Sequence, residues 1–191
     1  KKADIHLKLR PGTNVAFANG IMHVIIEEGL QDMKFIEERT EGYEKIKEIV
    51  KDYTPEKVAE ICHIDPDDLR KAAIMYAKAD KAPIIYCLGV TEHSTGTEGV
   101  MSMSNMALLV GKLGREGCGV NPIRGQNNVQ GACDMGAGPK DYPGYQKVEN
   151  PEVREKFEKA WGVKLNPNNG LHSTEVFPAA IEGKVKGLYI Y

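Results

Sequence analysis

Residues 114–139 read GREGCGVNPIRGQNNVQGACDMGAGP and contain seven glycines. Glycine loses more backbone freedom on folding than any other residue, so we expect neither a stable helix nor a stable strand here. The stretch also lacks the apolar periodicity of a buried element. It therefore predicts a long loop, and long loops inside compact domains are uncommon and usually functional.

The predicted loop carries many neutral hydrogen-bonding side chains around a central cation, Arg124. The amides are Asn121, Gln126, Asn127, Asn128 and Gln130. Glycines let a backbone approach a ligand, amides pair with neutral polar edges, and an arginine fork binds an anion through two parallel bonds. The loop therefore predicts a ligand site with Arg124 as its anion-binding residue. A structural alternative, in which Arg124 only pairs with an acidic side chain, stays open.

The composition is that of an ordinary globular protein, with 191 residues, 41% hydrophobic and 27% charged. This length allows one or two domains with a real core. The net charge of −2 and the absence of a basic stripe with interleaved aromatic residues argue against a nucleic-acid partner. We find no signal-peptide pattern and no apolar run long enough to span a bilayer. We therefore expect no direct membrane insertion and a cytoplasmic location, with membrane association through partner subunits as the alternative.

The cysteines do not form a metal-binding pattern. They are Cys62, Cys87, Cys118 and Cys133, and no Cys-x-x-Cys pair occurs among them. A self-contained zinc or iron–sulfur site needs closely spaced ligands. We therefore expect no metal ligands in this chain and reduced, structural cysteines, with Cys133 set apart by its place in the polar loop.

A glycine turn near the start of the chain leads from a predicted strand, residues 5–9, into a predicted helix. The turn contains Gly12, Thr13 and Asn14. A helix that begins after such a turn directs backbone N–H groups at an anion or nucleotide. Asn14 is also an ordinary N-cap residue, so a purely structural role stays open.

The sequence pattern over residues 33–80 predicts helices that serve as scaffold. Two of these helices should begin at Thr54-Pro55 and Asp65-Pro66. Residues 82–88 form a short apolar run between breakers, which is typical of a buried parallel strand. A polar loop, Gly89–Gly99, and a further helix follow. This order predicts a dinucleotide-like ligand at the carboxyl end of the strand, although the G-x-G-x-x-G fingerprint is absent. His93 in this loop is either a ligand or base, or simply solvated.

These patterns predict an α/β fold in two parts. Residues 1–123 would form a Rossmann-like parallel sheet flanked by helices, which binds a dinucleotide. Residues 124–191 would form part of a second α/β unit that begins with the active-site loop. In this unit we expect helices that begin near Asn150 and Ser173 and a strand at 185–191. Both ends of the chain look like cuts through a longer protein.

Residues 121–136, NPIRGQNNVQGACDMG, closely resemble a loop in the catalytic subunit of molybdopterin-dependent formate dehydrogenases. Similar segments are Arg39–Tyr43, Gly89–Thr91, Tyr142–Tyr145 and Arg154–Trp161. The resemblance covers most of the chain, but such a subunit is far longer. It therefore implies an internal fragment whose partners are the rest of the catalytic subunit and electron-transfer iron–sulfur subunits.

The resemblance implies a bis(molybdopterin guanine dinucleotide) cofactor with molybdenum or tungsten. It also implies an iron–sulfur cluster bound by a part of the subunit outside this chain. Arg124 matches the family's active-site arginine, which makes formate the expected substrate and carbon dioxide the product. The implied cofactor-binding residues are Gly12, Thr13, Asn14, Gly89, Val90, Thr91, Glu92, Gly125, Gln126 and Asn128. Many relatives carry aspartate in place of Asn14, so an amide contact replaces a carboxylate clamp here. No residue matches the metal ligand, and we expect the fragment alone to be inactive.

Two other classes of function stay open. The first is another molybdopterin oxidoreductase or the related large subunit of a respiratory NADH dehydrogenase. The second is a non-catalytic nucleotide-binding module, which would explain the strand, loop and helix but not the amide-rich loop around Arg124. A cysteine-rich cluster motif in the flanking sequence would separate these classes.

Overall fold

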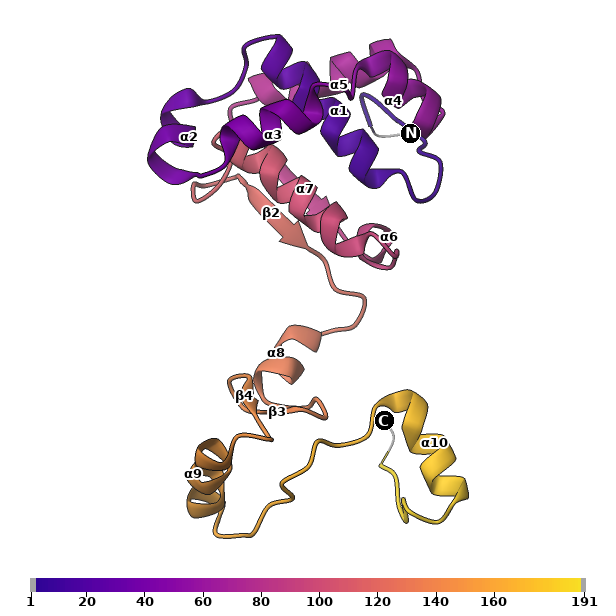
Figure 1. Ribbon diagram of the computed structural model, residues 1–191, viewed down its shortest axis with the longest axis vertical. Helices are drawn as coiled ribbons and strands as arrows, with labels where there is room; N and C mark the ends of the chain where they lie inside the picture. Colours follow the sequence, from indigo (N-terminus) through magenta and orange to yellow (C-terminus); the bar gives the residue numbers. More distant parts are fainter. Residues whose placement is uncertain (1–2, 190–191) are drawn as a thin grey trace. The chain divides into compact units, whose positions relative to one another are not determined.

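The computed structural model describes residues 3–189, and its ribbon is rich in helices (Figure 1). The chain divides into two compact units, residues 1–123 and residues 124–191. Each is described by itself below, as unit 1 and unit 2.

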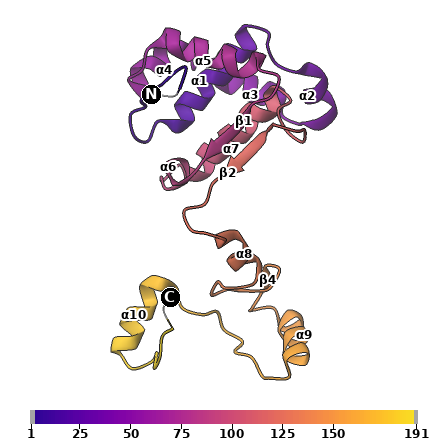
Figure 2. The ribbon, with the colours of Figure 1, turned by 180° about the vertical axis from the view of Figure 1, so that it is seen from behind.

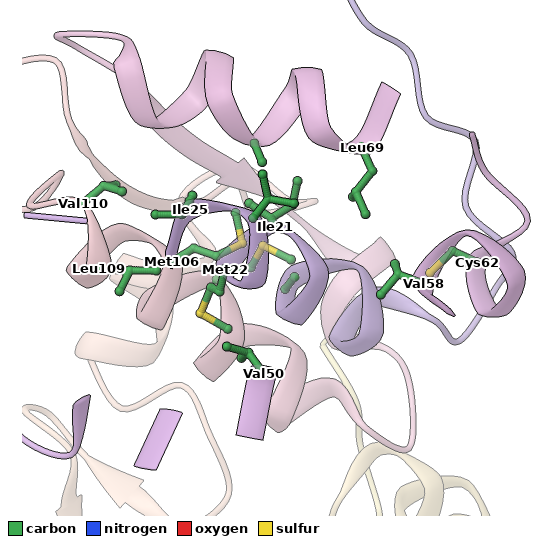
Figure 3. Packing of buried hydrophobic residues seen from close by; sticks show 14 of the residues in the cluster. Ile21, Met22, Ile25, Val50, Val58, Cys62, Leu69, Met106, Leu109 and Val110 are labelled. Atoms are coloured by element: carbon green, nitrogen blue, oxygen red, sulfur yellow. The ribbon is translucent and has the colours of Figure 1, made fainter. Parts of the chain in front are cut away.

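Helix α1 (Asn14–Glu27) is the centre of unit 1. Its most extensive contacts are with α3 (Tyr43–Val50), α4 (Pro55–Cys62), α5 (Pro66–Lys78) and α7 (Gly96–Leu109). Its residues Ile21, Met22 and Ile25 are almost fully buried and pack with side chains from these neighbours (Figure 3). A helix with apolar residues on most of its faces is a core helix, so α1 organises the interior of unit 1.

The scaffold helices predicted over residues 33–80 are confirmed as α2 (Met33–Arg39), α3, α4 and α5. Helix α4 begins after Thr54, whose side chain accepts a hydrogen bond from Lys57 N at 3.4 Å. Helix α5 begins after Asp65, whose carboxylate accepts from Asp67 N at 2.8 Å. Both helices carry proline in the first turn, as the sequence predicted.

The sheet of unit 1 has two strands, β1 (Pro83–Tyr86) and β2 (Gly119–Pro122), which pair in parallel (Figure 2). Helix α7 lies between them in the sequence and packs against β2. A small parallel sheet flanked by helices confirms the predicted α/β class, and β1 confirms a parallel strand within residues 82–88. The burial expected of this strand is wrong, because its residues are exposed or only half-buried where the two-stranded sheet leaves them uncovered.

Three expectations about local structure in unit 1 are wrong. Strand β2 lies inside the stretch predicted to be a loop, because ladder pairing with β1 outweighs the weak strand preference of its glycine and asparagine. The segment after β1 is not an open loop but begins with the helical turn α6 (Leu88–Thr91). Residues 5–9 form no strand, and the adjoining Arg10 N–H instead donates to Cys62 O at 2.9 Å.

Unit 2 is built from short elements. They are α8 (Val129–Asp134), β3 (Asp141–Tyr142), β4 (Gln146–Lys147), α9 (Pro151–Trp161) and α10 (Ser173–Ile181). Strands β3 and β4 pair in antiparallel orientation. The helix starts predicted near Asn150 and Ser173 are confirmed. The predicted strand at 185–191 is absent over 185–189, and its last two residues lie outside the described part of the chain.

Helix α8 is the second element found inside the predicted loop. It begins after Asn128, which adopts a left-handed conformation with φ +53°. A methyl group at Gly131 would collide with the Asn128 side chain, so this glycine permits the helix to start there. One of the glycines that argued against regular structure therefore leaves room for the Asn128 side chain at the start of this short helix.

Among residues 3–189, no helix is both long enough and apolar enough to cross a membrane.

Candidate functional site

The turn before α1 brings the first group of predicted site residues to the surface. Gly12 has φ +84°, which favours glycine, and no heavy atom lies within 4 Å of the position that a Cβ would occupy. Thr13 Oγ1 donates to Arg10 O at 2.6 Å and thereby closes the turn. Asn14 is the first residue of α1 rather than its N-cap, and Thr13 holds the N-cap position. The N-cap role considered for Asn14 is therefore wrong.

Asn14 connects this turn to the segment that follows β1. Its Nδ2 atom donates to Gly89 O at 3.5 Å, although the two residues are far apart in sequence. His93 Nε2 lies 3.0 Å from the same carbonyl oxygen, so this exposed histidine has a backbone partner rather than only solvent. Two segments that the sequence singled out separately thus lie side by side in unit 1. Their contact with a cofactor stays a prediction.

The remaining predicted residues of unit 1 lie in or next to α6. Val90 and Thr91 belong to the helical turn, and Glu92 is its exposed C-cap residue. A side chain at Gly96, the first residue of α7, would collide with the Thr91 carbonyl group. Gly96 therefore allows α6 and α7 to approach closely. This role was not predicted, because a close approach between two backbones leaves no pattern in a single sequence.

Arg124 and the other predicted residues, Gly125, Gln126 and Asn128, belong to unit 2. Gly125 and Gln126 are exposed in the segment before α8, and Asn128 is the residue from which α8 starts. Each unit therefore carries part of the predicted site.

Arg124 lies at a cavity of about 260 Å³, which is lined by Arg124, Val129, Gln130, Cys133 and Tyr145. Its Nη2 atom donates to Gln130 Oε1 at 3.2 Å. Within residues 3–189, no carboxylate lies at ion-pair distance from Arg124. A guanidinium has five N–H donors and is permanently charged, so most of its donors remain available to an anion.

Two side chains that the sequence analysis did not assign, Asp134 and Tyr145, lie next to this cavity. Tyr145 OH donates to Asp134 Oδ1 at 2.8 Å, and Gln130 Nε2 lies 3.2 Å from the same hydroxyl. The hydrogen bond to Asp134 raises the pKa of the Tyr145 phenol, and burial and the Asp134 charge act in the same direction. The four-residue spacing of Gln130 and Asp134 was a detectable signal of a shared helix face. The contact that Tyr145 makes with Asp134 left no such signal in the sequence.

The described part of the chain, residues 3–189, contains no group of three or more histidine, cysteine, aspartate or glutamate side chains arranged to hold a metal ion. The four cysteines are free thiols. Cys62 is buried, and burial raises the pKa of its thiol, whereas Cys133 is exposed.

A family model described as Molybdopterin oxidoreductase matches residues 1–191. The chain is 51% identical over 191 residues to the F420-dependent formate dehydrogenase subunit alpha of Methanocaldococcus jannaschii, covering 100% of this chain and 28% of that protein. It is 50% identical over 189 residues to formate dehydrogenase H of Escherichia coli, covering 98% of this chain and 26% of that protein. The chain therefore spans about a quarter of the length of these curated relatives.

A solved structure, acetylene hydratase from Pelobacter acetylenicus, is also similar. It has 37% sequence identity and a TM-score of 0.56, over 57% of this chain and 15% of that one.

Proposed function

The chain belongs to the molybdopterin oxidoreductase family, and we propose that it is part of the catalytic subunit of a molybdenum or tungsten formate dehydrogenase. The family membership confirms the resemblance seen in the sequence and implies a molybdopterin cofactor with its metal. Relatives named as formate dehydrogenases are 50–51% identical to this chain over 98–100% of its length. Since the chain spans only about a quarter of those relatives, the proposed activity belongs to a longer protein.

The observation that carries the substrate assignment is the state of Arg124. Its guanidinium lies at a cavity of about 260 Å³ and has a neutral amide, Gln130, as its hydrogen-bond partner. Formate is a carboxylate with almost no further atoms. A guanidinium can grip such a group with two parallel, charge-assisted bonds. We therefore assign Arg124 as the residue that binds and orients formate for oxidation to carbon dioxide.

The residues of unit 1 fit a pterin guanine dinucleotide. Apart from the neighbouring residues in the chain, no atom of residues 3–189 lies within 4 Å of the Cβ position at Gly12 or Gly89, so a ligand can reach the backbone at both places. The first N–H groups of α1 suit a phosphate, and the Asn14 amide suits a neutral edge such as guanine. Val90, Thr91 and Glu92 would extend this surface, with Thr13 beside it. In unit 2, Gly125, Gln126 and Asn128 offer a flexible backbone and amides for a second such ligand.

When bound, the cofactor would accept two electrons. The protein would orient the substrate and the cofactor and supply the surrounding electrostatic field. We propose that it is the bis(molybdopterin guanine dinucleotide) form. We further propose that an iron–sulfur cluster held elsewhere in the subunit, and then iron–sulfur partner subunits, carry the electrons away in the cytoplasm. On this proposal the 191-residue chain is inactive by itself.

The first prediction concerns Arg124 in the full-length enzyme. Arg124→Ala should lower kcat/KM for formate by at least about tenfold, because a hydrogen bond to a charged group contributes roughly 1.5–3 kcal/mol. Arg124→Lys keeps the charge but loses the planar fork, so it should recover only part of the loss. The measurement is formate-dependent dye reduction, normalised to the molybdenum or tungsten content of each variant.

Gln126→Ala is the matched variant for cofactor binding. A neutral amide suits pterin or guanine edges better than formate, so this variant should lose metal while keeping most of its activity per bound metal. If Arg124→Ala instead loses its metal and keeps full activity per bound metal, Arg124 holds the cofactor and the substrate assignment is wrong.

Another molybdopterin oxidoreductase is the second candidate, and the likeness to acetylene hydratase favours it. The name of that protein, which is 37% identical in sequence and matches 57% of this chain, describes a different reaction. A metal-loaded full-length enzyme that fails to reduce dye with formate would support this candidate.

A further inference from the structure

Arg124 is connected to two other parts of unit 2 through a single side chain, Gln130. Arg124 Nη2 donates to Gln130 Oε1 at 3.2 Å, and Gln130 Nε2 donates to Asp134 Oδ1 at 3.3 Å. Tyr145 OH donates to the same Asp134 oxygen at 2.8 Å. These three side chains, Gln130, Asp134 and Tyr145, form a polar network that ends at the guanidinium, and we call it the Asp134 network.

The direction of these hydrogen bonds follows from the charge of Asp134. An ionised carboxylate only accepts hydrogen bonds, so Gln130 must turn its NH₂ group toward Asp134. The amide oxygen then remains for Arg124, whose side chain has only donors. The Asp134 network therefore selects one of the two orientations of the Gln130 amide, the one that holds an acceptor against the guanidinium.

The backbone of unit 2 keeps the network together. Gln130 and Asp134 are four residues apart in α8, so they share one face of the helix. Tyr145 comes from the turn between β3 and β4, where Gly144 has φ +75° and Tyr145 has φ +58°. Gly144 N–H donates to Asp134 O at 2.7 Å and ties this turn to the end of α8. A positive φ is uncommon outside glycine, so the conformation of Tyr145 indicates that its surroundings hold it in place.

Gln130 also separates the charge of Asp134 from the charge of Arg124. A direct contact between guanidinium and carboxylate would occupy the fork and neutralise it. Through the neutral amide, Asp134 orients Arg124 without forming an ion pair with it. The remaining guanidinium donors stay available at the cavity, where their positive charge favours an anion.

We propose that Gln130, Asp134 and Tyr145 are positioning residues that aim the Arg124 guanidinium at a small carboxylate anion and leave its charge unneutralised. This inference rests on the proposed function, in which Arg124 binds formate.

The decisive variant is Gln130→Glu in the full-length, metal-loaded enzyme. Glutamate has the shape of glutamine but places a negative charge beside Arg124. At pH 7 the KM for formate should rise by about tenfold or more, since a charge-assisted contact with the substrate is replaced by an internal ion pair. Gln130→Met has similar length without amide or charge, and its KM should rise only about threefold.

The split between KM and kcat distinguishes positioning from a merely structural role. A carboxylate beside Arg124 opposes the binding of an anion rather than the chemical step, so Gln130→Glu should raise the KM for formate at pH 7 while its kcat and metal content stay close to those of the parent enzyme. Tyr145→Phe removes a single oxygen atom and should lower kcat/KM about threefold at unchanged metal content. Gln146→Met is the matched control: Gln146 lies in the same hairpin, but its partners are Pro143 and Lys156, and its substitution should leave the KM unchanged.

Each outcome tests either the role of the Asp134 network or the proposed function of Arg124 on which that role depends. If Gln130→Glu binds formate as well as Gln130→Met at pH 7, or loses kcat rather than affinity for formate, the role given to the network is wrong. If Arg124→Ala weakens formate binding while Gln130→Glu and Tyr145→Phe both match the parent, the network inference alone is wrong. If Arg124→Ala leaves the KM unchanged, the proposed function of Arg124 is wrong.

Discussion

Tyr76 shows how burial changes the chemistry of a single side chain. Its hydroxyl oxygen is buried and has no hydrogen-bond partner in the part of the chain that the structure describes. Burial raises the pKa of Tyr76 to about 12, with a smaller electrostatic contribution from Cys118. The Lys112 ammonium lies 5.6 Å from the centre of the Tyr76 ring, a contact that does not need the hydroxyl.

We predict that Tyr76→Phe is at least as stable as the parent chain at pH 7, because it removes a buried polar atom without a partner. The unfolded tyrosine ionises near pH 10, whereas the folded one resists ionisation up to about pH 12. Stability that depends on the neutral phenol is therefore lost as the pH rises from about 10 toward 12. The advantage of Tyr76→Phe in melting temperature should widen between pH 9 and pH 11. An unchanged difference over this range would contradict the assigned cause.

Arg124 shows how far a single sequence predicts the surroundings of a candidate site residue. Its charge among glycines and amides predicted an anion-binding group, and the structure gives it a cavity and no ion pair among residues 3–189. The contact between Gln130 and Asp134 could have been predicted from their four-residue spacing if α8 had been recognised as a helix. The contact of Tyr145 could not, because it depends on a hairpin turn with two successive positive φ angles.

Among the helices, α1 depends on one glycine for its packing. A methyl group at Gly20 would lie 2.9 Å from Val58 Cγ2 and 3.2 Å from Leu69 Cδ2. Carbon atoms at such distances repel one another, and Val58 and Leu69 are fully buried. Gly20 therefore sets how closely α1 approaches α4 and α5.

We predict that Gly20→Ala destabilises the chain by about 1 kcal/mol. Alanine favours the helix by about 1 kcal/mol, but overpacking a buried contact costs roughly 1–3 kcal/mol. Urea unfolding of Gly20→Ala, Val58→Ala and the double variant measures the coupling between the two sites. The double variant should lose less than the sum of the two single losses. Strict additivity would mean that the methyl group does not press on Val58.

Elements with capping or apolar patterns were predictable, and elements that depend on distant partners were not. Thr54, Asp65 and Asn150 each mark a helix start that the structure confirms, because an N-cap acts within one turn. Strand β2 and helix α8 lie in a stretch whose glycines argued against both. β2 exists because β1 offers a ladder, and α8 is short enough to depend on local contacts. The strand expected at residues 5–9 has no ladder partner within the described residues, 3–189.

At the scale of the whole molecule, the two units differ in how much they bury. The main hydrophobic core lies entirely in unit 1 and is built around α1. Among its described residues, unit 2 buries only Tyr142, Phe157 and Ala179. Three of its aromatic side chains, Tyr142, Phe157 and Trp161, pack together with ring centroids 4.7–5.9 Å apart.

We therefore predict that residues 1–123 fold alone, whereas residues 124–191 do not. The first segment should show helical circular dichroism and a cooperative thermal transition, because it retains the whole main core. The second should show a broad transition, since so few side chains are buried. A sharp transition in residues 124–191 alone, or an unfolded 1–123 segment, would contradict this division.

The Asp134 network has one further property: all of its members, together with Arg124, lie between residues 124 and 145. A site assembled from distant segments can change only through several coordinated substitutions, but this one is a contiguous piece of the gene. Recombination between related genes would transfer the arginine and its supports together. On the proposed function, the group that binds the substrate and the residues that position it would then be inherited together as one contiguous segment.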